Sequence, residues 1–269
     1  MKDLLSYYSR YDEANRLFKG AGRLELARTQ EILTRFLPPA PCTVLDVGGG
    51  PGVYSLWLAR AGYEVHLVDL APEHVEQARA ASSAQKDHPV TSIQAGDARK
   101  LPQFDCSVDA VLLMGPLYHL TERSERLAAL REAHRVLRPG GVIVAAAISR
   151  FASLMAGLTE GHIDDPEFVR ILERDLHEGQ HRNLPENLGY FTRAFFHRPE
   201  ELIGELQDVG LSAVSVLPVE GPVWLANDFE ARWADKSRRK QLFDLVRRTE
   251  KEASLLMVSP HLLAIAERS

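Results

Sequence analysis

Cysteine is nearly absent from this chain, which has only Cys42 and Cys106 in 269 residues. Two cysteines at that separation match neither a disulfide framework nor the spacing of metal ligands, so we expect free thiols and no metal centre. Free thiols are typical of a reducing compartment. The first residues also lack an apolar segment followed by a small-residue cleavage site. Together these features predict a cytoplasmic protein.

Long apolar runs and an excess of basic residues are missing as well. The longest apolar run, 142–148, is far shorter than the ~20 residues that a membrane-spanning helix needs, so no membrane segment is expected. The formal charge is -5 at pH 7. Domains that bind nucleic acids usually carry a basic bias, so a nucleic-acid partner is not expected.

Two common phosphate-binding motifs are also incomplete. Gly48 and Gly50 begin a G-x-G-x-x-G pattern, but Val53 stands where its third glycine should be. A G-K-[ST] loop is missing, which argues against a bound triphosphate. A nicotinamide oxidoreductase is therefore only an outside alternative.

The chain does contain a short apolar run that ends in an acid and leads into a glycine cluster, residues 44–52. This run is typical of a strand, and a helical pattern starts near Val53. Glycine allows the sharp turn between the two and lets a ligand approach the backbone closely. The N–H groups at the start of the helix can then meet polar or negative ligand groups.

Strands alternate with helices along most of the chain, which predicts an α/β fold with a mostly parallel sheet and helices on both faces. Apolar strands such as 142–145 fit burial on both sides. Seven strands are expected, at 43–47, 64–69, 90–94, 109–114, 142–148, 213–219 and 261–266. Helices are expected at 53–61, 72–84, 121–137, 166–179, 199–209 and 228–253.

The pattern divides the chain into four parts. Residues 1–41 form an N-terminal helical segment, which Gly20 and Gly22 break in two, and residues 42–150 form the α/β core. Residues 151–197 have no convincing strand and are predicted to be a helical cap insertion. Residues 198–269 complete the sheet. Because the insertion follows the carboxyl end of a strand, where open α/β sheets bind ligands, we expect it to help form the site.

Asp46-Val47-Gly48-Gly49-Gly50-Pro51-Gly52 resembles motif I of the class I S-adenosylmethionine-dependent methyltransferases, in particular those of type 11/25. Asp69 resembles the family's ribose-binding acid and residues 96–98 its adenine-recognising segment, in the correct order and spacing. Residues 137–141 resemble its turn into the fifth strand. The resemblance covers residues 40–148. It implies a Rossmann-like fold with seven strands, S-adenosylmethionine as cofactor and S-adenosylhomocysteine as product.

The resemblance also implies which residues bind the cofactor. Asp69 lies ~20 residues beyond the glycine turn, as a carboxylate that accepts ribose hydroxyls requires. An ordinary turn aspartate is the alternative interpretation of Asp97. In similar enzymes an N-terminal helix closes over the cofactor, which suggests Tyr11 and Arg23 here. The predicted cofactor-binding residues are Asp46, Gly48, Gly49, Gly50, Asp69, Leu70, Asp97, Ala98, Met114, Tyr11 and Arg23.

Tyr118 and His119 follow the fourth strand, where cofactor and acceptor should meet, and are the catalytic candidates. Histidine titrates at about 6.5 when unperturbed, so His119 could act as a base; a packed lining histidine is the equal alternative. His197 is a weaker candidate. The histidines of the insertion have no metal-ligand spacing. Residues 114–119 lack the Asn/Asp-Pro-Pro-aromatic motif of the family's enzymes that act on nucleobases or glutamine, which disfavours those substrates.

The predicted function is in-line transfer of a methyl group to the oxygen or nitrogen of a small-molecule acceptor, by a monomer or homodimer without a metal. One alternative is an RNA or protein methyltransferase, which should show an extended or basic groove beside the cofactor. Another is a non-catalytic protein that binds S-adenosylmethionine as a sensor or partner subunit. The sequence leaves the acceptor and the methylated atom open.

Overall fold

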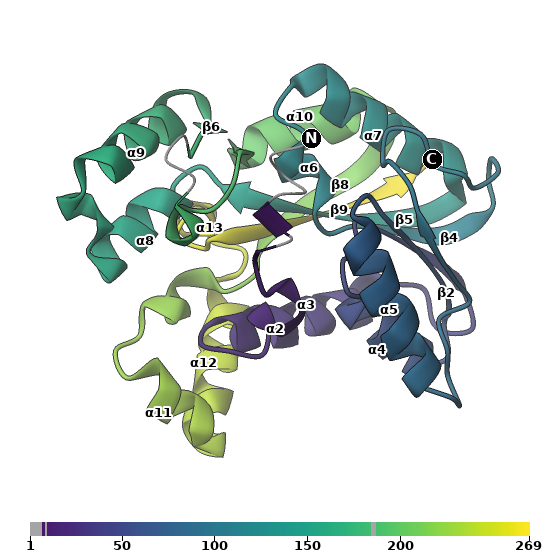
Figure 1. The fold of residues 1–269 in the computed structure, drawn as a ribbon, viewed down its shortest axis with the longest axis horizontal. Coiled ribbons are helices and arrows are strands. Elements are labelled where there is room, and N and C mark those ends of the chain that lie inside the picture. Colours follow the sequence, from purple (N-terminus) through teal and green to yellow (C-terminus); the bar gives the residue numbers. More distant parts are fainter. Residues whose placement is uncertain (1–6, 9, 184–186) are drawn as a thin grey trace.

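A single sheet runs through the centre of the computed structural model, which describes residues 7–8, 10–183 and 187–269 (Figure 1). Its main path has the order β3-β2-β1-β4-β5-β7-β6, while β9 pairs with β5 and β8 pairs with β9. The strands are β1 (Thr43–Val47), β2 (Glu64–Asp69), β3 (Ser92–Ala95), β4 (Val108–Leu113), β5 (Leu137–Ser149), β6 (Gln180–His181), β7 (Ala194–His197), β8 (Leu211–Pro218) and β9 (His261–Arg268).

The sheet is mostly parallel, as predicted. Strands β1 to β5 run in one direction, whereas β8 and β9 form an antiparallel pair and β9 is antiparallel to β5. The parallel strands have apolar residues on both faces, because each face is covered by helices.

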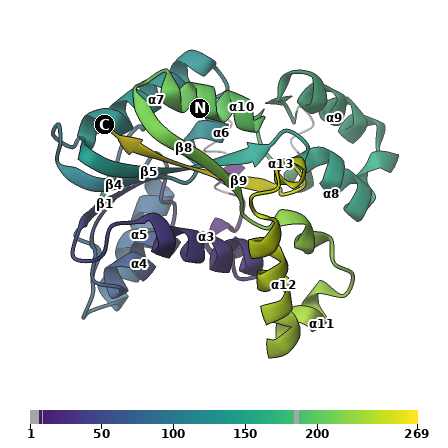
Figure 2. The same ribbon diagram turned by 180° about the vertical axis from the view of Figure 1, so that it is seen from behind.

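Helices cover the two faces of the sheet in separate sets (Figures 1 and 2). On one face Ile32 of α3 and Leu58 of α4 join the core beneath Val44. On the other face Leu130 of α7 and Leu202 of α10 pack in a second core with Leu45 of β1. The helices are α2 (Glu13–Arg16), α3 (Gly22–Phe36), α4 (Val53–Arg60), α5 (Pro72–Ala84), α6 (Pro116–His119), α7 (Arg123–Val136), α8 (Ala152–Glu160), α9 (Pro166–Glu178), α10 (Pro199–Gln207), α11 (Phe229–Ala234), α12 (Lys236–Thr249) and α13 (Ala253–Leu256).

The N-terminal segment is broken at glycines, as predicted. Gly20 has φ +51, in the left-handed region. A Cβ on Gly22 would stand 2.4 Å from the Arg16 carbonyl oxygen. The break separates α2 from α3, so α2 can pack beside the start of α3. Residues 3–6 and 9 of the predicted helical segment lie outside the described residues.

The prediction of a purely helical insertion is wrong, and the described residues form nine strands instead of seven. Strands β6 and β7 lie within 151–197, beside the expected helix α9. β7 pairs in parallel with the end of β5, Ile148 with Phe196 and Ser149 with His197. That part of β5 extends past its last pairing with β4, at Ala145. Its exposed backbone groups there need partners, and the short aromatic run of β7 supplies them.

The prediction of one helix over 228–253 is also wrong. The structure has two helices there, α11 and α12, separated at Asp235. The Asp235 carboxylate accepts a hydrogen bond of 2.8 Å from the Arg238 N–H and so caps α12. Aspartate is a preferred N-cap because it satisfies an N–H group that the helix leaves unpaired. Within the described residues, no helix is long and apolar enough to cross a membrane.

Candidate active site

A cavity of about 450 Å³ opens where β1, β2 and β4 end, at one edge of the sheet. Register pairs Val47 of β1 with Val68 of β2 and with Leu113 of β4, so the segments that follow these strands meet there. Residues of α2, α3 and α6, Arg193 of the insertion and His261 of β9 complete the wall. The predicted residues that line this cavity are Gly48, Gly49, Gly50, Asp69, Leu70, Asp97, Ala98, Met114, Tyr118 and His119.

The glycine turn after β1 forms the part of the wall nearest the sheet. Gly48 and Gly50 have φ of +72 and +56, in the left-handed region. A Cβ on Gly49 would stand 2.8 Å from Asp46 Oδ2, and one on Gly48 2.6 Å from Pro116 Cδ. Glycine is required here for both conformation and space. The backbone of this turn is therefore open to a ligand in the cavity.

Asp46 lies behind the glycine turn and is fully buried. Ser55 donates a hydrogen bond of 2.7 Å to Oδ2, whereas Oδ1 finds no partner among the described residues. Burial raises the pKa of Asp46 to about 6. Asp46 itself does not line the cavity, so its contact with a ligand stays a prediction.

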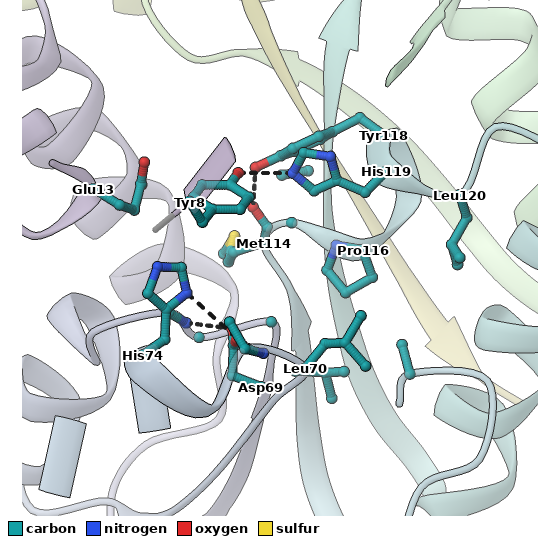
Figure 3. Close-up of a pocket in the computed structure, with 18 of the residues that line it drawn as sticks. Tyr8, Glu13, Asp69, Leu70, His74, Met114, Pro116, Tyr118, His119 and Leu120 are labelled. Atoms are coloured by element: carbon teal, nitrogen blue, oxygen red, sulfur yellow. Dashed lines mark hydrogen bonds and ion pairs between the residues drawn. The ribbon is translucent and has the colours of Figure 1, made fainter. Parts of the chain in front are cut away.

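Asp69 joins the end of β2 to the glycine turn. Its carboxylate accepts hydrogen bonds of 2.8 Å from the N–H groups of Gly50 and Ala71, and His74 Nδ1 lies 3.4 Å away (Figure 3). Each carboxylate oxygen can accept a second hydrogen bond. Asp69 is therefore held in place and still able to accept from a diol in the cavity.

Asp97 has a strong partner that the sequence did not reveal. Its oxygens accept from Arg99 Nε at 3.0 Å and Nη2 at 2.6 Å, and also from the Arg99 N–H. The Arg99 hydrogen bonds hold the pKa of Asp97 below its ordinary value. Asp97 thus has the contacts of a turn aspartate as well as a place in the cavity wall, so both interpretations of it stay open.

Both catalytic candidates already have hydrogen bonds in this structure (Figure 3). Tyr118 donates to the Met114 carbonyl at 3.0 Å, and Tyr8 Oη lies 2.8 Å from His119 Nε2. Burial raises the pKa of Tyr8 well above 10, so the phenol is neutral, and the tautomer of His119 sets which of the two groups donates. Burial lowers the pKa of His119 to about 4. His119 is therefore neutral near pH 7, with Nε2 hydrogen-bonded to Tyr8 and Nδ1 without a partner among the described residues.

Tyr11 and Arg23 do not line the cavity. The ring of Tyr11 stacks on Tyr7 with centroids 5.1 Å apart. Arg23 pairs with Glu230 at 2.5 Å and lies 5.6 Å from the ring of Trp233. Their roles toward a cofactor stay predictions, but the cavity-lining residues of the same region are Tyr8, Glu13, Arg16 and Glu25.

A group of charged side chains at the far end of the cavity was missed by sequence reasoning. Arg16 Nη1 and Nη2 donate to Glu25 at 2.5 and 3.0 Å. His261 Nδ1 lies 2.6 Å from Glu220 Oε1 and 3.7 Å from Glu25 Oε2. These residues come from four separate segments, and no local spacing links them.

The charges in this group stabilise one another. Burial alone would raise the pKa of Glu25, but Arg16 and His261 lower it. Burial alone would lower the pKa of His261, but Glu25 and Glu220 outweigh burial and raise it to about 9. One ligand atom each of Glu25, Glu220 and His261 lies within 4.8 Å of the others. Arg16 already occupies both Glu25 oxygens, so a shared proton suits this group better than a metal ion.

The remaining histidine candidates lie outside the cavity wall. His197 is buried 3.4 Å from Glu205, beside Arg126. His181 contacts Asp175 at 2.8 Å. The contact of His197 with Glu205 connects the insertion to α10, whereas His181 and Asp175 both lie within the insertion.

Comparison with known proteins agrees with this architecture. Residues 44–141 match the family model described as a methyltransferase domain. The chain is 31% identical over 189 residues to the ubiquinone biosynthesis O-methyltransferase of Xanthomonas axonopodis pv. citri, with 69% of each chain covered. A solved S-adenosylmethionine-dependent methyltransferase from Methanosarcina mazei has a TM-score of 0.59 at 19% identity, over 88% of this chain and 96% of that one.

A second solved structure, a possible histamine N-methyltransferase from Thermotoga maritima, also has a TM-score of 0.59, at 16% identity, over 100% of this chain and 99% of that one. At such identities the two structures are evidence for the fold alone. Fold and site together define an S-adenosylmethionine-dependent methyltransferase of class I. The chain belongs to this family, which confirms the predicted enzyme class and Rossmann-like fold.

Proposed function

We propose that this methyltransferase transfers a methyl group from S-adenosylmethionine to a hydroxyl oxygen of a small molecule held in the cavity. The observation that carries the proposal is the cavity itself, which joins the glycine turn to the charged group around His261. Its volume of about 450 Å³ falls in the range of small-molecule sites, ~300–1,000 Å³.

The charge of the cavity wall favours a small molecule over RNA. Its carboxylates outnumber its arginines, whereas a phosphate backbone needs a groove of Lys and Arg. The carboxylates are Glu13, Glu25, Asp69, Asp97, Glu122 and Glu125, and the arginines are Arg16, Arg99 and Arg193. Oxygen is favoured over nitrogen as the acceptor atom because the similar Xanthomonas proteins are named O-methyltransferases.

The residues of the cavity wall fit the cofactor. Asp69 would accept the ribose hydroxyls, the N–H groups of the glycine turn would meet the methionyl part, and Asp97 with Ala98 would lie at the adenine. The unpaired oxygen of Asp46 suits a ligand that carries an ammonium group. When bound, S-adenosylmethionine supplies an electrophilic methyl group on a sulfonium ion.

The protein's own contribution is then placement and exclusion of water. Walls from α2, α3 and the insertion hold the acceptor against the cofactor end of the cavity. Such placement can lower a barrier by ~7–11 kcal/mol. The proposal needs no metal.

Calorimetry with S-adenosylhomocysteine, followed by transfer of labelled methyl groups to a panel of phenols, alcohols, amines and thiols, tests this function. We expect micromolar binding and turnover of hydroxyl acceptors. Asp69→Ala should weaken binding at least tenfold, whereas Asp87→Asn, at an exposed position, should not change it. A folded protein that binds no S-adenosylhomocysteine would overturn the proposal. Tight binding without turnover would point to a sensor, and turnover of RNA alone to the RNA alternative.

A further inference from the structure

We propose that His261, held in place by Glu220, is the general base that takes the proton from the acceptor hydroxyl. This inference rests on the proposed O-methylation and deepens it. It assigns the proton transfer to the end of the cavity away from the glycine turn, and not to His119.

Glu220 has the contacts of a positioning residue. It is 3% exposed and follows the end of β8. Its Oε2 accepts from Ser259 Oγ at 2.7 Å and from the His261 N–H at 3.2 Å. Its Oε1 lies 2.6 Å from His261 Nδ1. With the carboxylate fixed by three donors, Nδ1 carries the proton that it donates to Oε1, and the lone pair of neutral His261 is on Nε2.

His261 Nε2 is the ring nitrogen left for a ligand. His261 lines the cavity, and its side chain is 28% exposed. Within the described part of the chain, the hydrogen bonds of His261 involve Nδ1 and the backbone. In His119, by contrast, Nε2 is already hydrogen-bonded to Tyr8. The hydroxyl of Tyr118 also has a partner, because it donates to the Met114 carbonyl.

The surrounding charges favour a proton on His261. Glu220 and Glu25 face the ring, and Arg16, which pairs with Glu25, partly offsets them. An imidazolium formed during the reaction would therefore be stabilised by two carboxylates, one of them already neutralised by Arg16. This is the arrangement that a general base needs after it has accepted a proton.

The pKa of His261 agrees with this geometric assignment. Glu25 and Glu220 outweigh burial and raise the pKa of His261 to about 9, whereas burial lowers the pKa of His119 to about 4. Of these two cavity histidines, His261 is therefore the stronger base.

The step balances in atoms and electrons. The acceptor O–H proton passes to Nε2 of neutral His261, and the oxygen keeps the electron pair with which it bonds to the methyl carbon. The electron pair of the broken carbon–sulfur bond stays on sulfur. His261 then releases its extra proton to water, which restores the base.

Two readouts that do not depend on turnover test the positioning by Glu220. In a titration followed by histidine NMR, we expect the pKa of His261 to lie well above the ordinary value of histidine, about 6.5, and to fall by at least one unit in Glu220→Gln. Bound 4-nitrophenol, with S-adenosylhomocysteine present, should ionise at a lower pH in the wild type than in His261→Asn. An unchanged His261 pKa in a folded Glu220→Gln would overturn the inference.

Kinetics on the best hydroxyl acceptor of the panel give the third readout. His261→Asn should lower kcat at least 100-fold and leave the affinity for S-adenosylhomocysteine unchanged, with His88→Asn as the matched control. The kcat/KM of the wild type should rise with pH toward 9, and this limb should move to lower pH in Glu220→Gln. If Glu220→Gln does not fold, the kinetics of His261→Asn alone decide whether His261 is the base.

A wild-type protein that methylates no hydroxyl would overturn the proposed function. A wild type that does so while His261→Asn keeps full activity, or while His119→Asn alone loses it, would overturn only the assignment of His261. The two proposals can therefore fail separately.

Discussion

Tyr8 Oη and His119 Nε2 share a hydrogen bond of 2.8 Å across the cavity. Tyr8 belongs to the N-terminal segment and His119 to α6, 111 positions away, so this bond links the N-terminal segment to the α/β core. The ring of Tyr8 also meets His74 edge-on, with centroids 5.1 Å apart. The N-terminal segment is thus fixed at the cavity by a polar contact and a ring contact.

Tyr8→Phe should free His119 Nε2 and shift the pKa of His119, because the hydrogen bond that Nε2 shares with the Tyr8 hydroxyl is lost. Loss of a buried hydrogen bond should also lower the free energy of unfolding by ~1–2 kcal/mol. Histidine NMR and denaturant unfolding measure the two effects. Tyr63→Phe, which removes a hydroxyl bonded to a backbone carbonyl far from the cavity, is the matched control. An unchanged pKa of His119 would contradict the expectation.

Asp46→Asn should weaken cofactor binding and stabilise the free protein above pH 6. The folded-state pKa of Asp46 is about 6 and its unfolded value about 3.9, so the folded state binds more protons between these values. Its stability therefore falls as pH rises from 4 to 6, by up to ~3 kcal/mol, and stays lower above. Unfolding curves of both proteins at pH 5 to 8, with calorimetry on S-adenosylhomocysteine, check this. A variant less stable than the wild type at pH 8 would argue against it.

Gly49→Ala should lower affinity for S-adenosylhomocysteine at least tenfold, because its Cβ would stand 2.8 Å from Asp46 Oδ2 and displace the turn. Gly204→Ala, in α10 with nothing within 4 Å of the added Cβ, should bind normally and gain up to ~1 kcal/mol of stability. Calorimetry and thermal unfolding of the pair give both quantities. Equal affinities would show that the turn tolerates a side chain.

Arg16→Gln and Arg23→Gln should behave differently although both lie in the N-terminal segment. Arg16 lines the cavity and donates two hydrogen bonds to buried Glu25, so its loss leaves Glu25 with His261 alone, 3.7 Å away, and should cost ~1–3 kcal/mol. Arg23 pairs with the exposed Glu230, and such surface pairs contribute ~0–1 kcal/mol. Denaturant unfolding separates the two. If Arg23→Gln alone weakens cofactor binding, the role predicted from sequence is supported.

Asp235→Ala should destabilise α12 by ~1 kcal/mol, because the N-cap hydrogen bond to the Arg238 N–H is lost. Hydrogen exchange across α12 measures the effect locally. Exchange in α7, which packs on the opposite face of the sheet, serves as the internal control. Unaltered exchange in α12 would mean that tertiary packing alone sets its N-terminus.

The glycine turn and the acids at the ends of the first strands could be predicted because each depends on a short stretch of sequence. These acids and glycines stand at or just after the ends of apolar runs, and parallel strands bring such positions to one edge of the sheet. The residues are Asp46, Gly48, Gly50 and Asp69. The strand β7 could not be predicted, because a run of four residues pairs only where β5 extends past β4.

The group around His261 was missed for a related reason. The charges of this group come from four separate segments, and only three-dimensional packing brings them together. The residues are Arg16, Glu25, Glu220 and His261. Arg23 was chosen from the same segment as Arg16, since spacing cannot tell which arginine faces the cavity once Gly20 and Gly22 have turned the chain. Pairs of distant charges are visible only in the structure.

The backbone pairing of β7 with β5 has a consequence for how the acceptor pocket can adapt. Arg193, which lines the cavity, stands directly before β7, whose Phe196 and His197 pair with Ile148 and Ser149. The wall that contains Arg193 is therefore joined by backbone hydrogen bonds to β5, which in turn pairs with β4. Within the described residues, the opposite wall, built from α2 and Tyr8, is joined to α6 by the side-chain hydrogen bond between Tyr8 and His119. A change of acceptor size would be accommodated on the N-terminal side, while the insertion keeps a fixed distance from the donor.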